Sequence, residues 1–200
     1  MHDPHQAFFD ELAAEWDLTY TAEDLERLLN LVGRMPISEG MSILDLGCGT
    51  GVLFDMLRRR VGLPGLVTGV DFSIRMAQKA HRNFPFPNVT VIDADASHLP
   101  FRDSSYDMIV SFSAFPHFIH KDLAVQEAGR VLKPGGLFYI IHLSSSKELE
   151  DIHHRVGGLV AHDTLPAAKD LRQMLLDSRF DNVGIEDHAG LFLAQAVNAK

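Results

Sequence analysis

Residues 43 to 51 constrain the fold of this chain more than any other stretch. They read Ile-Leu-Asp-Leu-Gly-Cys-Gly-Thr-Gly, an apolar run with one carboxylate that leads into three glycines at alternate positions. The apolar residues predict a buried parallel strand, and glycine permits positive φ and lets a ligand lie against bare backbone. A helix that begins near Val52 would direct unpaired N–H groups toward that ligand. The stretch therefore predicts a nucleotide-type binding turn.

Downstream of this turn, apolar strands alternate with amphipathic helices, which predicts a parallel α/β sheet with helices on both faces. Such sheets bind ligands at the carboxyl ends of their strands, near the point where the strand order reverses. We expect strands at 41–46, 66–71, 89–93, 107–112 and 137–142, and helices at 52–60, 73–83 and 121–131. Asp45, Asp71, Asp95, Ser111 and His142 all lie at or just beyond these strand ends.

Size and charge narrow the class of protein. Two hundred residues, 46% of them hydrophobic, suffice for one domain with a buried core. The net charge of −9 leaves no excess of cations to neutralise a phosphate backbone, so we expect no nucleic-acid partner. The single cysteine, Cys48, excludes an internal disulfide and favours a reducing compartment. Without a secretory signal or a long apolar run, we expect a cytoplasmic protein that does not associate with membranes.

Further motifs accompany the glycine turn, and together they give the chain a family resemblance. They are Val67-Thr68-Gly69-Val70-Asp71-Phe72-Ser73, Asp93-Ala94-Asp95-Ala96, Phe101-Arg102-Asp103-Ser104-Ser105-Tyr106-Asp107 and Leu132-Lys133-Pro134-Gly135-Gly136. With residues 43–51, these motifs resemble those of class I S-adenosylmethionine (SAM)-dependent methyltransferases. The resemblance implies a Rossmann-like, mostly parallel seven-stranded sheet that ends in an antiparallel hairpin.

The resemblance also implies which residues bind the cofactor. The glycine turn would pass under the amino-acid half of SAM, Asp71 would hold the ribose hydroxyls, and Asp95 would accept a hydrogen bond from the adenine amino group. An N-cap role for Asp95 is compatible with this reading, and a tight turn without a ligand is the alternative for residues 43–51. The predicted cofactor-binding residues are Asp45, Gly47, Cys48, Gly49, Gly51, Asp71, Phe72, Asp95, Ala96 and Ser111.

We expect one methyltransferase domain over residues 1–200, with a helical lid at 1–35, a cofactor-binding core at 36–143, an acceptor-side helical segment at 144–179 and a hairpin at 180–200. Helices are expected at 4–17 and 22–34. Phe8, Phe9, Leu12 and Trp16 recur at helical spacing. Small-molecule methyltransferases of this family open with a similar segment that folds over the cofactor; a helix docked by its aromatic face is the alternative.

Histidines supply the predicted catalytic residues. His117 lies in Phe115-Pro116-His117-Phe118, which resembles the segment beside the transferring methyl group in the family, and imidazole titrates near neutrality. His142 ends a strand and His154 lies in a predicted amphipathic helix that Gly157 stops. His142, His154, His162 and Asp163 could converge on the acceptor pocket. Each of these histidines also has a purely structural reading.

The sequence is therefore compatible with two functions. The first is an enzyme that transfers a methyl group from SAM to a small-molecule acceptor without a metal and releases S-adenosylhomocysteine. The alternative is a binding or sensing module that holds a metal or a tetrapyrrole through His142, His154 and His162. Val52 stands where a dinucleotide fingerprint needs its third glycine, which disfavours a nucleotide-dependent oxidoreductase. Exposed faces of the N-terminal helices or of 147–165 could pair two copies as a homodimer.

Overall fold

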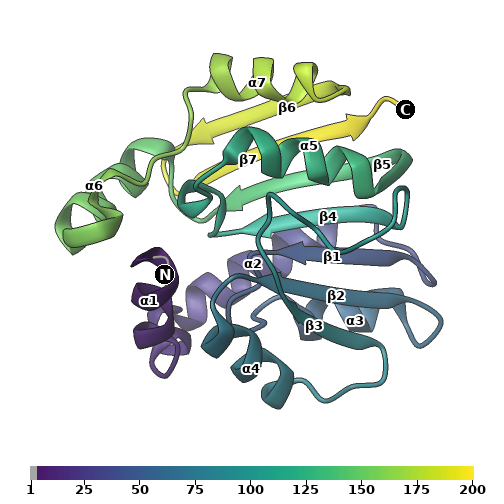
Figure 1. Ribbon diagram of the computed structural model, residues 1–200, viewed down its shortest axis with the longest axis horizontal. Helices are drawn as coiled ribbons and strands as arrows, with labels where there is room; N and C mark the ends of the chain where they lie inside the picture. The colour runs from purple at the N-terminus through teal and green to yellow at the C-terminus, as the bar shows by residue number, and fades with distance from the viewer. Residues whose placement is uncertain (1–3) are drawn as a thin grey trace.

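A seven-stranded sheet runs through the molecule in the order β3-β2-β1-β4-β5-β7-β6 (Figure 1). The structure is a computed structural model that describes residues 4–200. The strands from β1 to β5 are parallel, whereas β7 runs antiparallel to both β5 and β6. The strands are β1 (Ser42–Leu46), β2 (Leu66–Asp71), β3 (Val89–Asp93), β4 (Tyr106–Phe112), β5 (Leu132–His142), β6 (Phe180–His188) and β7 (Leu191–Asn198). The predicted Rossmann-like sheet with its C-terminal hairpin is confirmed.

Helices cover both faces of this sheet. They are α1 (Pro4–Leu12), α2 (Ala22–Arg34), α3 (Phe54–Val61), α4 (Ile74–Asn83), α5 (Lys121–Val131), α6 (Ser146–Val156) and α7 (Ala168–Asp177). Short 3₁₀ turns occur at η1 (Trp16–Thr19), η2 (Phe115–His117) and η3 (Gly158–His162). No helix in the described range 4–200 is long and apolar enough to cross a bilayer.

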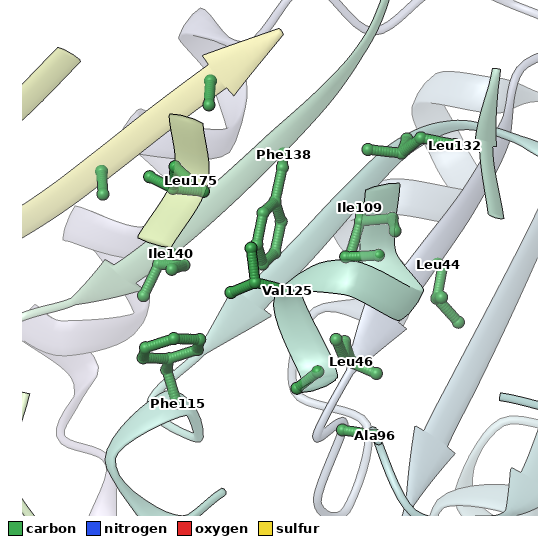
Figure 2. Packing of buried hydrophobic residues seen from close by; sticks show 14 of the residues in the cluster. Leu44, Leu46, Ala96, Ile109, Phe115, Val125, Leu132, Phe138, Ile140 and Leu175 are labelled. Atoms are coloured by element: carbon green, nitrogen blue, oxygen red, sulfur yellow. The ribbon is translucent and has the colours of Figure 1, made fainter. Parts of the chain in front are cut away.

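Two apolar cores follow from the alternation of side chains along the strands. Leu44, on one face of β1, belongs to a core that includes Val125 of α5 and Leu175 of α7; Figure 2 shows this packing. Ile43, on the opposite face, belongs to a second core that includes Leu28 of α2 and Leu57 of α3. Because both faces of β1 are covered, residues 43–46 of this strand are buried and apolar except for Asp45, as the sequence predicts.

Three elements have a boundary that differs from the prediction by two residues or more. The helix expected at 4–17 ends at Leu12, and the chain resumes as η1. The helix expected from residue 52 begins at Phe54, after the glycine turn has continued through Leu53. β5 begins at Leu132 rather than 137, because Leu132 already pairs with Tyr106 before an irregularity in the register. The helix at 22–34 is confirmed to the residue by a capping box at Thr21.

The carboxyl ends of the parallel strands all lie at one edge of the sheet. In Figure 1 the N-terminal helix α1 and the segment with α6 lie beyond this edge, on the left of the view. The strand order reverses between β1 and β4, where β1 pairs with β2 on one side and with β4 on the other. This arrangement places the glycine turn, which follows β1, at the reversal point.

Candidate active site

The glycine turn packs tightly against the loop that follows β4. Gly47 has a φ of +77°, and a Cβ atom there would lie 2.3 Å from the Cβ of Ala114. Gly49 has a φ of +52° and faces the indole of Trp16. Any side chain at Gly47 would therefore meet both backbone strain and a collision. The turn leaves its bare backbone on the wall of a cavity.

Asp71 closes β2 and is tied to the turn by its carboxylate. Its Oδ2 accepts a hydrogen bond from the Gly49 N–H at 2.7 Å, and its Oδ1 accepts one from the Ser73 N–H at 2.9 Å. Burial raises the pKa of Asp71 to about 6, although these two backbone donors oppose the shift. Ser73 in turn caps α4 by accepting from Met76 N–H at 3.2 Å.

Asp45 lies beside Asp71 on the same cavity wall. The side chain is buried, and its Oδ2 has no hydrogen-bond partner within the described chain. Burial, with the nearby charge of Asp71, raises the pKa of Asp45 well above its usual value. An unpartnered buried carboxyl is costly unless a ligand supplies a donor, so Asp45 favours a ligand with a positive or hydrogen-donating group.

Two adjoining cavities form a cleft along these residues. The first holds about 580 Å³, part of it open to solvent, and the second about 420 Å³. Asp45, Cys48 and Gly49 line the first, whereas Asp95 and Ala96 line the second. The residues that line both are Gly47, Asp71, Phe72, His117 and Phe118.

The first cavity suits a cation. Its ionisable groups are two carboxyls, one imidazole, one phenol and one thiol, with no lysine or arginine among its lining residues. Phe9, Trp16 and Phe72 add aromatic rings, and the faces of such rings attract cations. The carboxylates and rings fit the sulfonium and ammonium groups of SAM. The second cavity extends from Asp71 to Asp95 and Ala96, where the adenosine part of SAM could lie.

The N-terminal segment closes one side of the first cavity, with Phe9, Trp16 and Tyr20 lining it. Lys79 of α4 holds this segment by donating to the carbonyl oxygens of Ala13 and Ala14 and by pairing with Asp17 at 2.8 Å.

The glycine turn and α4 hold the same segment from another direction. The Thr50 hydroxyl donates to Asp17, and Ser73 Oγ donates to Asp10 of α1 at 2.6 Å. The segment is thus tied to the turn and to α4 by polar contacts as well as by its aromatic side chains.

His117, which lines both cavities, pairs with a carboxylate from far along the chain. Its Nδ1 lies 2.7 Å from Oδ2 of Asp163, and His5 Nε2 lies 3.3 Å from Oδ1 of the same side chain. The His117 ring also lies 4.9 Å from the rings of both Phe9 and His153, measured between centroids. Burial lowers the pKa of His117, and the hydrogen bond with Asp163 opposes that shift.

The sequence suggested that His142, His154 and His162 could converge on the acceptor pocket. The structure does not bring these three histidines together. His154 and His162 are exposed, whereas His142 is buried at the end of β5. The buried histidine of α6 is His153, whose Nδ1 hydrogen-bonds to the carbonyl oxygen of Asp163. No group of three or more histidine, cysteine or acidic side chains within residues 4–200 is arranged to hold a metal.

Most of the predicted cofactor-binding residues line the cleft. Gly51 and Ser111 line neither cavity, since Gly51 packs against Phe54 and Ser111 is buried within β4. The sequence did not predict Tyr20 and Ser113, which line the first cavity, or the pairing of His117 with Asp163. The orientation of His153 could be read from the sequence, because it lies four residues after Leu149 and so shares the helical face of that residue.

The chain resembles known methyltransferases in sequence. The model of a protein family described as "Methyltransferase domain" matches residues 43–136. The demethylmenaquinone methyltransferase of Staphylococcus aureus is 30% identical over 166 residues, which cover 79% of this chain and 68% of that protein.

Solved structures share the fold over nearly the whole length. A chain from the complex of the Haloferax volcanii Trm112 methyltransferase activator with a methyltransferase superposes with a TM-score of 0.83 at 22% identity, covering 100% of both chains. A SAM-dependent methyltransferase from Aquifex aeolicus gives a TM-score of 0.70 at 23% identity, covering 98% of this chain and 99% of that one. The sequence relationship and the shared fold together show that the chain belongs to the class I SAM-dependent methyltransferases.

Proposed function

We propose that this protein transfers the methyl group of SAM to a small-molecule acceptor bound between His117 and the N-terminal segment. One observation carries the proposal: a continuous cleft leads from Asp95, past the buried Asp71, to an acidic and aromatic cavity beside His117. The demethylmenaquinone methyltransferase, whose name describes a small-molecule reaction, supports the acceptor class.

The cofactor would lie along the shared wall of the two cavities. Asp71 would accept hydrogen bonds from the ribose hydroxyls, because each of its oxygens receives only one backbone N–H and retains another lone pair. Asp95 and Ala96 would bound the adenine, and Asp45 with Gly47 and Gly49 the methionine part. The bound cofactor supplies an electrophilic methyl group on a sulfonium; the protein aligns it with the acceptor.

His117 would remove the proton from the acceptor. Hydrogen bonds from His117 and His5 overcome the effect of burial and hold the pKa of Asp163 below its usual value, so this carboxylate is ionised at neutral pH. A carboxylate only accepts hydrogen bonds, so Nδ1 of His117 carries the hydrogen and Nε2 carries the lone pair. His117 is then a neutral imidazole with its basic nitrogen available.

The N-terminal segment 4–20 would act as a lid. Its aromatic side chains exclude water from the first cavity, and water exclusion protects an electrophilic methyl group and strengthens charge interactions inside. The ties from Lys79, Thr50 and Ser73 would have to open to admit the cofactor. We assign residues 36–143 to cofactor binding and 144–179 to the acceptor side.

We do not propose the alternative module with a metal or a tetrapyrrole, because its three histidines do not converge.

A cytosolic location remains a proposal that rests on the single buried Cys48. A homodimer likewise remains a prediction, which sedimentation velocity would test. The Haloferax volcanii chain is complexed with an activator, and the same measurement would detect a comparable partner that co-purifies with this chain.

Calorimetric titration with SAM and with S-adenosylhomocysteine tests the proposal. Both should bind with one-to-one stoichiometry, and Asp71→Ala should weaken binding by roughly 1 to 3 kcal/mol, as for a lost hydrogen-bonding partner. Asp93→Ala is the matched control, since Asp93 pairs with Asp71 in the sheet register but lines neither cavity. Absence of binding by both compounds would refute the proposal.

A further inference from the structure

We infer that Asp163 is a positioning residue that couples the docking of helix α1 to the orientation and basicity of His117, so that the base is assembled only when the lid is closed. The inference rests on the proposed function and deepens it. It also names an acceptor class: a small molecule whose reacting atom bears an ionisable hydrogen, such as a phenol, an enol or an amine.

One carboxylate joins three parts of the chain. Asp163 follows η3, and its two oxygens reach His117, just beyond β4, and His5 on α1. These side chains are largely buried, with exposed fractions of 14% for Asp163, 12% for His117 and 20% for His5. Asp163 therefore links lid and base directly, without intervening residues.

The backbone around Asp163 is itself fixed. Its N–H donates to the carbonyl oxygen of Val160 at 3.0 Å, and its carbonyl oxygen hydrogen-bonds to His153 Nδ1. The turn that presents the carboxylate also packs against the N-terminal segment, because Val160 of η3 shares one buried apolar cluster with Phe9 and Ala13. Docking of α1 therefore supports this turn and also adds His5 as a second partner of the carboxylate that faces His117.

A carboxylate is required because both imidazoles use it at once. An ionised carboxylate accepts on both oxygens, so both facing nitrogens carry hydrogens. An asparagine would offer one oxygen and one N–H₂, and could serve only one of the two in this way. The other titratable groups that face Asp163 or His117 are His153 of α6, His142 of β5 and Lys121 of α5.

Docking of α1 changes the surroundings of His117 in a second way. Phe9 of α1 lies edge-on to the His117 ring and also lines the first cavity. Removing α1 would expose the imidazole to water and take one hydrogen-bond donor from Asp163. In the closed protein the acceptor gives its proton to His117 Nε2 as its lone pair forms the bond to the methyl carbon. The carbon–sulfur bond breaks to leave a neutral thioether, and the imidazolium is paired with Asp163.

The test uses two variants and two measurements on the full-length protein. Imidazole ¹⁵N spectra report the tautomer and pKa of His117, and fluorescence of Trp16, the only tryptophan, reports the dissociation of S-adenosylhomocysteine from the cavity it lines. Asp163→Asn should change the His117 nitrogen shifts and lower its pKa. His5→Phe should shift the His117 resonances although it leaves Asp163 in place.

Both variants should speed S-adenosylhomocysteine dissociation by roughly 5- to 10-fold, as for one lost hydrogen bond, and the double variant should dissociate no faster than the more affected single one. His162→Phe is the matched control, because His162 adjoins Asp163 but is exposed. Unchanged His117 spectra in His5→Phe, or additive dissociation rates, would overturn the coupling. Failure of the wild-type protein to bind would refute the proposed function instead, and spectra of the ligand-free protein would still decide whether Asp163 and His5 act on His117.

Discussion

Single residues decide the chemistry of the cleft, and Asp71 is the clearest example. It is almost fully buried between two backbone donors, yet it must be ionised to accept hydrogen bonds from a ribose. Burial raises the pKa of Asp71 to about 6, close to physiological pH. Protonation of this one group should therefore control cofactor affinity in weakly acidic solution.

We expect the affinity for S-adenosylhomocysteine to be constant above about pH 7 and to fall below about pH 6, approaching tenfold per pH unit. The sign follows because binding requires the ionised carboxylate, so a proton must be lost before the ligand binds. The ligand has no group that titrates between pH 5 and 7. Calorimetry across that range should show proton release in the wild type and a flat, weak profile in Asp71→Asn.

His142 should make the fold acid-sensitive. Burial lowers the pKa of His142 to about 3, while an unfolded histidine titrates near 6.5. Between these values the unfolded state binds the extra proton, so the free energy of unfolding falls as pH decreases through 6.5. This cost is about 2 kcal/mol at pH 5. His142→Leu should remove it, which urea unfolding at pH 7 and pH 5 would measure against the exposed control His162→Leu.

At this scale the sequence predicts the cofactor side better than the acceptor side. Asp71 and Gly47 are readable because they belong to a local strand–turn–helix pattern that places them wherever the fold forms. His117 was identified from a local motif as well. Asp163 was expected near the acceptor pocket, but its pairing with His117 was not, because 46 residues separate the two and no local pattern encodes a contact made by a returning loop.

Among the elements, the N-terminal segment packs against the rest of the fold through only a small apolar cluster. It contributes a small cluster with Phe9 and Ala13 that packs around Met76 and Val160, apart from the two main cores. Polar ties, notably from Lys79, account for much of its attachment. Segments with few buried apolar contacts open at low free-energy cost.

Lys79→Met should loosen the segment selectively. It removes three contacts at the end of α1 and at η1 while retaining the apolar stem. We expect faster amide hydrogen exchange in residues 4–20 and little change in the strands, as measured by mass spectrometry. Lys169→Met, on the surface of α7, is the control, and equal exchange in both variants would contradict the role of Lys79.

The break in this segment could not be predicted from periodicity. Phe8, Phe9, Leu12 and Trp16 fit one helix, but in the structure Trp16 lies in η1 and reaches the glycine turn through a change of chain direction. The contact that selects this conformation is tertiary, since the indole faces Gly49. Helix α2, whose Thr21 capping box is local, was predicted to the residue.

At the scale of the whole molecule, the cleft lies between two groups of strands that share one sheet. β1 and β2 supply the turn and Asp71, while the loop after β4 supplies His117. A ligand in the cleft contacts both groups and the lid, so its binding energy should add to the stability of the entire fold.

S-adenosylhomocysteine at 100 times its dissociation constant should raise the free energy of unfolding by about 2.7 kcal/mol. For a chain of this size the midpoint temperature should rise by roughly 5 to 10 °C. Calorimetry should show one transition that moves as a unit. Two transitions, with only one shifted, would show that lid and sheet unfold independently, and an unrelated nucleotide such as ATP serves as the control.

The fold as a whole was predictable because many local signals agree. Alternating apolar strands and amphipathic helices predict the parallel sheet, and the motif resemblance implies the antiparallel hairpin that β6 and β7 form. The acceptor side was less predictable: helical spacing places His153 on the face of Leu149, but the contact of His153 with the Asp163 carbonyl oxygen is tertiary and has no local signal.

Cys48 gives the molecule a built-in reporter. Its sulfur packs beneath the turn so closely that a Cβ atom at Gly69 would lie 2.8 Å from it, and burial raises its pKa well above the usual value, which suppresses the thiolate. Since it is the only thiol in the chain, an alkylating reagent can label the protein at no other sulfhydryl. The labelling rate therefore measures how often the glycine turn opens to expose Cys48, without any engineered probe.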